Sequence, residues 1–358
     1  MVPGPVSLSR SVLEALAQDY PSGQIDADFF PLYRSTERLL QHVMETQNRV
    51  LLLSGEGMLA LWSALKSAVR TDDRILVVAT GFFGHGIASM AREIGARVTV
   101  LDLGYDRTIT DADLALVEEH LTVSPPKMIC AVHCETPSGT LNPLEKLGQL
   151  KEQYGVPLFY VDMVSSVAGC PIKVDAWHID FALGGSQKCL SCPPSLSFVA
   201  VSERGWEAVR EVKYAGYDAL LPFYSIYEDG RCPYTPNWNG IAALHASLNE
   251  IFREGLAGVF RRHVSAADFL RQGLDKLGIA LWPKKDALLS PTVTAARVPE
   301  GFTVSAWREA LRVRGLVVAG SFGPMADCVF RIGHMGTQAQ RSLLAQALDV
   351  MDDALRRR

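Results

Sequence analysis

The chain has 358 residues, of which 48% are hydrophobic and 21% charged, so it can bury a substantial core and is not a disordered protein. Its 35 basic and 39 acidic residues give a net charge of −4, and no basic run follows a helix face, which argues against nucleic-acid or membrane-surface binding. The first residues lack the blocks of a signal peptide, and no stretch approaches the roughly 18 apolar residues of a spanning helix, so we expect a cytoplasmic protein.

Short apolar runs alternate with segments of helical periodicity between about residues 36 and 202. We expect strands just before Ser54 and at 75–80, 97–103, 128–133, 157–163, 180–185 and 196–201. We expect the intervening helices at 57–68, 86–94, 111–121 and 143–154. This alternation predicts an α/β fold with a mostly parallel sheet, in which ligands bind at the carboxyl ends of the strands.

The pattern changes after residue 203. A segment at 203–236 is irregular and rich in Tyr, Gly and Pro, and one long helix is expected over about 238–277. Strands are then expected at 292–298, 315–321 and 329–334, with a helix between the first two and a last helix from Gln338. We therefore predict three parts, which are an N-terminal segment over 1–35, a large domain over 36–255 and a smaller α+β domain over 256–358.

Two polar residues follow buried strands at the expected ligand edge. Asp162 ends an apolar run, where a carboxylate is costly unless a cation or a donor meets it, and a helix cap or an ion pair is the structural alternative. Lys188 follows a strand and two glycines, where desolvation lowers the pKa of an amine and makes it available for Schiff-base chemistry. A lysine that simply reaches solvent is the alternative. Together the two residues predict a pyridoxal site, with the carbonyl on Lys188 and the ring nitrogen on Asp162.

A glycine turn joins the first strand to its helix. Gly55, Glu56 and Gly57 stand at the N-terminus of that helix, where free N–H groups and the helix dipole suit a phosphate. Glu56 would repel a phosphate dianion unless its side chain turned away. A simple tight connection is the alternative function of the turn.

Three further residues carry candidate contacts. Thr136 and Ser138 follow the strand at 128–133, where their hydroxyls can reach the phenolate oxygen of a cofactor. Arg331 follows a short apolar run, and its guanidinium can clamp a substrate carboxylate in a bidentate manner or form a structural ion pair.

The seven cysteines give no metal site by their spacing. Cys189 and Cys192 form the one CxxC pair, and the other five cysteines supply no second pair of the kind that zinc requires. We expect buried, inert thiols and no bound metal.

The order and spacing of these motifs resemble the class V, fold type I aminotransferases of the alanine–glyoxylate and serine–pyruvate kind. The matching segments include GSQK at 185–188, YVDMVSS at 160–166, ETPSGTLNP at 135–143 and RIGHMG at 331–336. The resemblance implies a pyridoxal 5′-phosphate enzyme that moves an amino group from an amino donor to a small 2-oxo acid, pyruvate or glyoxylate. It implies that the large domain binds the cofactor and that the N-terminal segment contributes to the site and to a homodimer with shared active sites.

The resemblance also implies a role for each matching residue around the cofactor ring. Lys188 would carry the internal aldimine, and Asp162 would bind the pyridine nitrogen. Val164 would pack under the ring and Phe83 would stack over it. Thr136 would approach the phenolic oxygen.

Other matching residues are implied to hold the phosphate and the substrate. Gln187 would help to bind the phosphate together with the backbone of Gly57 and Met58. Thr235 would reach the phosphate in the site of the neighbouring subunit. Arg331 would bind the substrate carboxylate.

A narrower similarity is to the pyridoxamine–pyruvate aminotransferases, which take the unphosphorylated vitamer as substrate. Glu56 matches a glutamate that occupies their would-be phosphate site and excludes a dianion. Phe322 stands where those enzymes have a second arginine for a carboxylate. This activity, a lyase reaction on the same cofactor and a non-catalytic cofactor-binding protein remain alternatives, because the fold does not decide the reaction.

Overall fold

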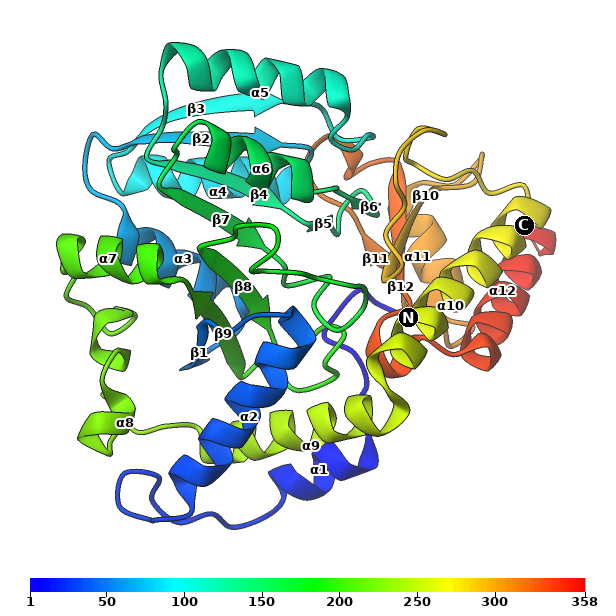
Figure 1. Cartoon of the computed structure of the whole chain (residues 1–358). Helices are drawn as coiled ribbons and strands as arrows, with labels where there is room; N and C mark the ends of the chain where they lie inside the picture. Colours follow the sequence, from blue (N-terminus) through cyan, green and yellow to red (C-terminus); the bar gives the residue numbers. More distant parts are fainter. Residues whose placement is uncertain (358) are drawn as a thin grey trace.

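A twisted seven-stranded sheet forms the centre of the larger part of the protein in the computed structural model, which describes residues 1–357 (Figure 1). In their hydrogen-bonded order the strands are β1 (Arg49–Ser54), β9 (Leu196–Val201), β8 (Phe181–Gly185), β7 (Leu158–Asp162), β4 (Met128–Val132), β2 (Arg74–Ala79) and β3 (Arg97–Asp102). Strand β9 is antiparallel to both of its neighbours, and the other ladders are parallel. The predicted α/β fold with a mostly parallel sheet is therefore confirmed.

The burial of the central strands explains why their positions could be predicted. Every residue of β4, β7, β8 and β9 is buried, as expected for apolar strands that are covered on both faces. The six strands from β2 to β9 in this sheet start and end within one residue of the predicted ranges. The carboxyl ends of the five parallel strands β2, β3, β4, β7 and β8 therefore place the polar residues that follow them at one edge of the sheet.

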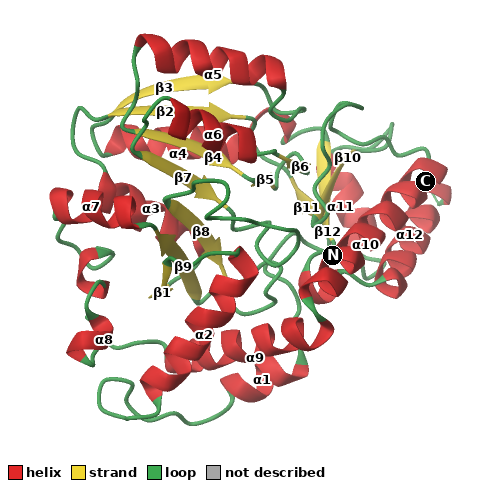
Figure 2. Ribbon diagram, viewed as in Figure 1, coloured by secondary structure: helices red, strands yellow, loops and turns green. Residues whose placement is uncertain are grey.

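Helices surround this sheet, and a short hairpin lies beside it (Figure 2). The helices of the larger part are α1 (Arg10–Leu16), α2 (Phe29–Met44), α3 (Gly57–Ala68), α4 (Phe82–Glu93), α5 (Asp111–Val123), α6 (Glu145–Gln153), α7 (Glu203–Val212), α8 (Ile226–Asp229) and α9 (Trp238–Glu254). Helix α3 packs on β8 and β9, whereas α4 packs on β2 and β3. The hairpin consists of β5 (Cys134–Glu135) and β6 (Thr140–Leu141).

Helix α7 lies in the segment that was expected to be irregular, so that expectation was wrong. Ser202 caps the helix by accepting a hydrogen bond from the backbone N–H of Gly205 at 3.0 Å. The helix buries Trp206 and Val209 on one face, and this spacing stabilises a helix that faces a core. The abundance of Tyr, Gly and Pro later in the segment obscured this short amphipathic pattern.

The predicted long helix over 238–277 is two helices. Helix α9 ends at Glu254, and α10 (Leu256–Lys276) begins after Gly255. Gly255 has φ of 82° and ψ of 133°, which are dihedrals that no α-helix contains. The apolar periodicity continues across this break, so the pattern did not reveal it.

A three-stranded antiparallel sheet and three helices form the smaller part. Its strands are β10 (Val293–Arg297), β12 (Val329–Gly333) and β11 (Ala319–Gly320), and its helices are α10, α11 (Val304–Arg312) and α12 (Arg341–Arg356). Strand β11 has only two residues instead of the predicted seven, because Leu316 and Val318 are buried in the core without strand pairing. The last helix begins at Arg341, after a single 3-10 turn, and not at Gln338.

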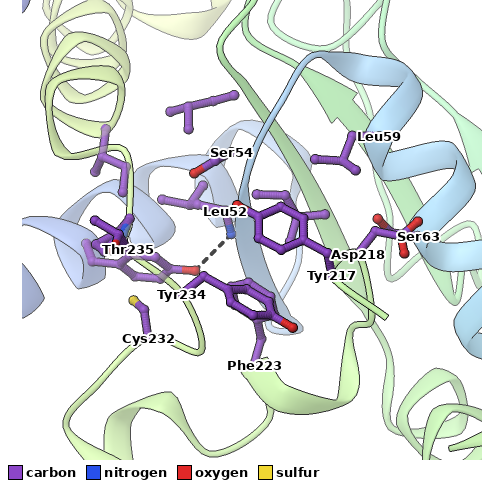
Figure 3. A pocket seen from close by; sticks show the side chains of 15 residues that line it. Leu52, Ser54, Leu59, Ser63, Tyr217, Asp218, Phe223, Cys232, Tyr234 and Thr235 are labelled. Atoms are coloured by element: carbon purple, nitrogen blue, oxygen red, sulfur yellow. Dashed lines mark hydrogen bonds between the residues drawn. The ribbon is translucent and has the colours of Figure 1, made fainter. Parts of the chain in front are cut away.

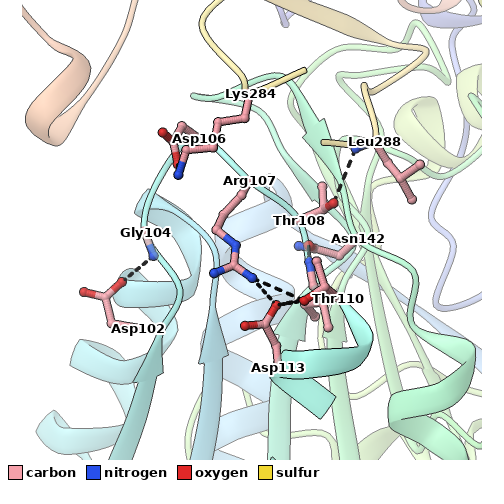
Figure 4. A network of polar contacts seen from close by, with 11 residues as sticks. Asp102, Gly104, Asp106, Arg107, Thr108, Thr110, Asp113, Asn142, Lys284 and Leu288 are labelled. Atoms are coloured by element: carbon pink, nitrogen blue, oxygen red, sulfur yellow. Dashed lines mark hydrogen bonds and ion pairs between the residues drawn. The ribbon is translucent and has the colours of Figure 1, made fainter. Parts of the chain in front are cut away.

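Each part has its own hydrophobic core, and loops join the two (Figure 4). Lys284 of the smaller part forms an ion pair with Asp106 at 3.3 Å, and the backbone N–H of Leu288 donates to Thr108 Oγ1 at 3.3 Å. The N–H of Leu141 in the hairpin donates to the carbonyl of Leu288 at 2.9 Å. The exact boundaries of the three predicted parts stay a prediction. None of the helices within residues 1–357 combines the length and apolar character needed to cross a bilayer.

Candidate active site

Adjacent parallel strands bring Asp162 and Lys188 together. Asp162 is the last residue of β7, and Lys188 follows the end of β8 by three residues. Because β7 and β8 are parallel neighbours, their carboxyl ends meet at the same edge of the sheet. The charge of Lys188 lowers the pKa of Asp162, and the charge of Asp162 raises the pKa of Lys188, so the two groups are close enough to interact electrostatically.

The amine of Lys188 is held in a desolvated position. Burial lowers the pKa of this amine, and the positive charge of Arg331 lowers it further. Its Nζ donates a hydrogen bond to the backbone carbonyl of Pro3 at 2.5 Å. A lysine with a lowered pKa has a larger neutral fraction near pH 7, which is the nucleophilic and basic form.

Asp162 combines deep burial with one open acceptor oxygen. It is 6% exposed, and burial raises its pKa to about 6, although the N–H of Val164 and the charge of Lys188 act in the opposite direction. Val164 donates this backbone bond to Oδ1 at 2.8 Å. Within residues 1–357, Oδ2 has no hydrogen bond. The carboxylate is therefore mostly ionised near pH 7, and it can accept a hydrogen bond from a protonated ring nitrogen.

The glycine turn at the start of α3 packs closely against neighbouring strand ends. A Cβ atom on Gly57 would lie 2.9 Å from both methyl groups of Val164, and one on Gly185 would lie 3.1 Å from the Cα of Gly57. A Cβ on Gly55 would lie 2.5 Å from Leu59 Cδ2. The backbone of α3 therefore approaches the end of β8 more closely than side chains would allow.

Glu56 points into the site and not away from it. Gln187 Nε2 donates to Glu56 Oε2 at 3.1 Å, and Gln187 Oε1 is buried without a hydrogen-bond partner within the described chain. Met58, in contrast, is exposed. The N-terminus of α3 thus presents a carboxylate and an unsatisfied acceptor, and this pair favours a hydrogen-bond donor over an anion.

The two hydroxyls after β4 have different surroundings. Thr136 Oγ1 and Ser165 Oγ lie 2.5 Å apart, next to the strand that delivers Asp162. Ser138 is fully buried and is bonded within its own hairpin, to the carbonyl of Glu135 and to Thr140 Oγ1. The contact of Ser138 with a cofactor stays a prediction, and its hydroxyl is bonded within the hairpin.

Arg331 lies on β12 of the smaller part and is 6% exposed. Burial lowers the pKa of its guanidinium to about 10, so the group stays charged at neutral pH. Its Nε donates to the carbonyl of Gly320 at 2.6 Å, and its terminal nitrogens make no hydrogen bond within residues 1–357. These nitrogens can bind a carboxylate side-on.

One phenylalanine lies against this arginine and a second stacks on the first, and the sequence analysis did not select the second. The guanidinium carbon of Arg331 lies 4.8 Å from the centroid of the Phe322 ring, and that ring stacks on Phe82 with centroids 5.0 Å apart. Phe82 comes from α4 of the larger part and packs edge-on against Phe83. The neighbouring aromatic pair at 82–83 was the available signal, but only Phe83 was selected from it.

Glu135 is a second residue that the sequence analysis did not select. It is fully buried and accepts the backbone N–H groups of Phe83 at 3.1 Å and Gly84 at 2.7 Å. Burial raises its pKa to about 7. Glu135 therefore fixes the first turn of α4, which carries both Phe82 and Phe83.

Thr235 lies in a different pocket, near the end of β1 (Figure 3). That pocket is lined by Ser54, Tyr217 and Tyr234 among others, and by none of Lys188, Asp162 or Arg331. Within one chain Thr235 is therefore not brought to the candidate site. Its predicted reach into the site of a neighbouring subunit stays a prediction.

Within residues 1–357 there is no cluster of three or more His, Cys, Asp or Glu side chains that could hold a metal ion. Cys189 and Cys192 are buried free thiols, and burial raises the pKa of each.

Comparison with known proteins places this geometry among enzymes. The chain matches the family described as "Aminotransferase class-V" over residues 22–324. It is 34% identical over 350 residues to an uncharacterised aminotransferase of Methanocaldococcus jannaschii, which covers 96% of this chain and 89% of the relative. It is 32% identical over 362 residues to the pyridoxamine–pyruvate transaminase of Mesorhizobium japonicum, with 98% and 90% covered. The solved alanine–glyoxylate aminotransferase of Nostoc sp. has a TM-score of 0.93 at 29% identity, with 99% and 94% covered.

Proposed function

The chain belongs to the class V aminotransferases, and from this premise we propose that it uses pyridoxal 5′-phosphate to move an amino group from an amino donor to pyruvate or glyoxylate. The observation that carries the proposal is the position of Asp162 and Lys188 at the carboxyl ends of two adjacent parallel strands, where the charge of each affects the pKa of the other. The names of the alanine–glyoxylate and pyridoxamine–pyruvate relatives support these two acceptors.

The residues at the predicted ring position fit this cofactor, whereas Glu56 at the predicted phosphate position does not favour an anion. When bound, it supplies an electron sink that stabilises negative charge on the α carbon of the substrate. The open Oδ2 of the ionised Asp162 suits the protonated ring nitrogen.

Lys188 is proposed to transfer the proton, and Arg331 is proposed to bind the substrate carboxylate. In its neutral form, which burial favours by lowering the amine's pKa, Nζ of Lys188 would take the proton from the substrate α carbon and deliver it to the carbonyl carbon of the cofactor. The terminal nitrogens of Arg331 bind the substrate carboxylate and so orient the α carbon toward Lys188. The Phe322 ring lies against the guanidinium and is itself stacked on Phe82.

The proposed assembly is a homodimer with shared active sites. Thr235, Tyr217 and Tyr234 are exposed around one pocket, and exposed aromatic side chains of this kind are enriched at protein interfaces. In the proposed dimer, Thr235 reaches the partner's site. The cytoplasmic location stays a prediction from the sequence.

A second candidate function is favoured by the contact between Gln187 and Glu56. In this function the unphosphorylated vitamer is itself a substrate, and pyruvate accepts its amino group. The Glu56 carboxylate and the unpartnered Gln187 Oε1 are both acceptors, so a hydroxymethyl group satisfies them better than a phosphate dianion does.

Replacement of Lys188 tests the catalytic assignment. Lys188→Ala is expected to abolish the visible absorbance of the bound cofactor and to lower turnover of L-alanine with pyruvate or glyoxylate by roughly 10²–10⁴-fold or more. Lys173→Ala, at an exposed lysine of the same part of the chain, is the matched control and should behave as wild type. Undiminished transamination by Lys188→Ala would refute the proposal.

Analysis of the released small molecule separates the two candidate functions. The purified protein is denatured, and the supernatant is examined by mass spectrometry. Pyridoxal 5′-phosphate supports the main proposal. A protein that releases none, but converts added pyridoxamine to pyridoxal with pyruvate, supports the second candidate. Glu56→Gln should then increase the affinity for the phosphorylated form.

A further inference from the structure

The first six residues cross from the smaller part to the candidate site, and we call residues 1–6 the N-terminal strap. Figure 1 shows the N-terminus between the two parts of the molecule, next to β12. The backbone N–H of Gly333 in β12 donates to the carbonyl of Met1 at 3.0 Å. Gln338 Nε2 donates to the carbonyl of Val2 at 3.1 Å. The strap is therefore anchored to the smaller part at its start.

The other end of the strap is bonded to the loop that carries Lys188. The carbonyl of the buried Pro3 accepts the 2.5 Å hydrogen bond from Lys188 Nζ. Three residues later, the backbone N–H of Val6 donates to the carbonyl of Gln187 at 3.3 Å. Pro3 thus stands between an anchor on β12 and an anchor at the end of β8.

Two glycines allow the strap to lie close to Lys188 and to β12. Gly4 has φ of +89°, and a Cβ atom there would lie 2.5 Å from Cδ and 2.9 Å from Nζ of Lys188. A Cβ atom on Gly333 would lie 2.2 Å from the carbonyl oxygen of Val2. The strap therefore rests on Lys188 at a position where only glycine fits without displacing the lysine.

Lys188 and Asp162 influence each other's charge, yet within residues 1–357 they form no ion pair. A protonated amine and an ionised carboxylate in desolvated surroundings attract each other strongly. In an ion pair, the amine would be held in its protonated form, without a free lone pair. One carboxylate oxygen would be occupied by that amine and not free to accept another hydrogen bond. The carbonyl of Pro3 offers the amine another partner and so opposes this pairing.

We propose that the N-terminal strap is a positioning element for catalysis, in which the Pro3 carbonyl holds the free Lys188 amine away from Asp162. The inference rests on the proposed function in taking Lys188 as the proton-transferring base. Because the strap is anchored on β12 beside Arg331, it also ties the position of the amine to the strand that binds the substrate carboxylate.

The test uses the cofactor-free full chain and the variant Gly4→Ala. The rate at which Lys188 reacts with acetic anhydride is measured against pH, with peptide mass spectrometry to follow that residue. The added methyl group should push the amine off Pro3 and toward Asp162, and an anionic partner should raise the apparent pKa of Lys188 by about one unit or more. In Gly4→Ala combined with Asp162→Asn, this rise should disappear.

Gly315→Ala is the matched control. Gly315 has φ of +88°, nearly that of Gly4, but a Cβ atom there meets nothing within 4 Å. It carries the same backbone strain without the contact to Lys188, so the reactivity of Lys188 should equal that of wild type. A chain that lacks residues 1–5 also removes the carbonyl, adds no methyl group, and should raise the apparent pKa in the same direction.

Two results would overturn the proposal. One is an unchanged pH profile of Lys188 in both Gly4→Ala and the truncated chain, and the other is an equal shift in Gly315→Ala. The readout needs neither cofactor nor turnover. If the apparent pKa of Lys188 shifts in the variants but the wild-type protein fails to transaminate, the proposed function is contradicted and the positioning role of the strap stands. If the wild-type protein transaminates but the pKa does not shift, the proposed function stands and the positioning role is contradicted.

Discussion

At the scale of single residues, Glu135 shows how a buried charge can shape a site without facing its substrate. Its two carboxylate oxygens accept the backbone N–H groups of Phe83 and Gly84, at the positive end of α4. Gly81 leaves the space, because a Cβ atom there would lie 2.7 Å from the carboxyl carbon of Glu135. Burial outweighs these favourable contacts and raises the pKa to about 7, and the charge of Asp162 adds to the rise.

This raised pKa predicts a pH-dependent stability. Between pH 4.5 and about 7 the folded state keeps the proton on Glu135 while the unfolded state loses it, so stability falls as the pH rises. Relative to Glu135→Gln, which has no proton to lose, wild type should lose up to about 3 kcal/mol of unfolding free energy across this window and no more above it. Denaturant unfolding of both cofactor-free proteins at several pH values measures the difference, and a difference that is flat with pH would contradict the assignment.

The same comparison removes the effect of other titrating groups. Burial lowers the pKa of His133 and of His263 to about 4, and these groups oppose Glu135 by making stability rise with pH. The wild-type profile therefore mixes both directions. Only the difference between the two proteins isolates the carboxylate.

At the scale of elements, local pattern predicted those segments whose burial is uniform. Helix α3 matches its predicted range to the residue, and the central strands match because both of their faces are covered. The break at Gly255 could not be predicted, because a change of chain direction at one glycine leaves the apolar period of both helices intact. The family and the fold type I architecture expected from the motifs are confirmed by the comparisons.

Some residues of the candidate site could likewise be predicted from local sequence pattern, and others could not. Asp162 and Lys188 could be found because one ends a buried strand and the other comes three residues after the next, and Arg331 because it follows a short apolar run. The carbonyl of Pro3 and the ring of Phe82 were not found, because their partners come from distant parts of the chain and the sequence carries no spacing that relates them. Such contacts depend on how the two parts pack.

The helix break at Gly255 predicts that alanine substitutions at two nearby glycines change the free energy of unfolding in opposite directions. Gly255→Ala should lower the free energy of unfolding by about 1–3 kcal/mol, since φ of 82° is unfavourable for a residue with a Cβ atom. Gly258→Ala, three residues later inside α10, should raise it by up to about 1 kcal/mol, because alanine favours the helix. Calorimetric melting of the two variants measures both effects. Equal shifts in the same direction would mean that Gly255 is not the point at which the helix must end.

At the scale of the whole molecule, the candidate site exists only where the two parts meet. The larger part supplies the Lys188 amine and the Asp162 carboxylate, and the smaller part supplies Arg331. The loops drawn in Figure 4 and the N-terminal strap fix one part against the other. The aromatic stack of Phe82 on Phe322 joins the two parts next to Arg331, the arginine proposed to bind the substrate carboxylate.

A double-mutant cycle on this stack tests whether the two parts act together on the substrate. Phe82→Ala and Phe322→Ala should each lower kcat/KM for pyruvate, because Phe322→Ala removes the ring that lies against the Arg331 guanidinium and Phe82→Ala removes the ring on which Phe322 stacks. The double variant should be no worse than the poorer single variant, which corresponds to a coupling of about 0.5–1.5 kcal/mol, or roughly twofold to tenfold. Val313, exposed on the smaller part, provides the control, since Val313→Ala should combine additively with Phe82→Ala. Strict additivity of the two phenylalanine changes would mean that each ring acts on the arginine independently, and that the stack between the parts contributes nothing to substrate binding.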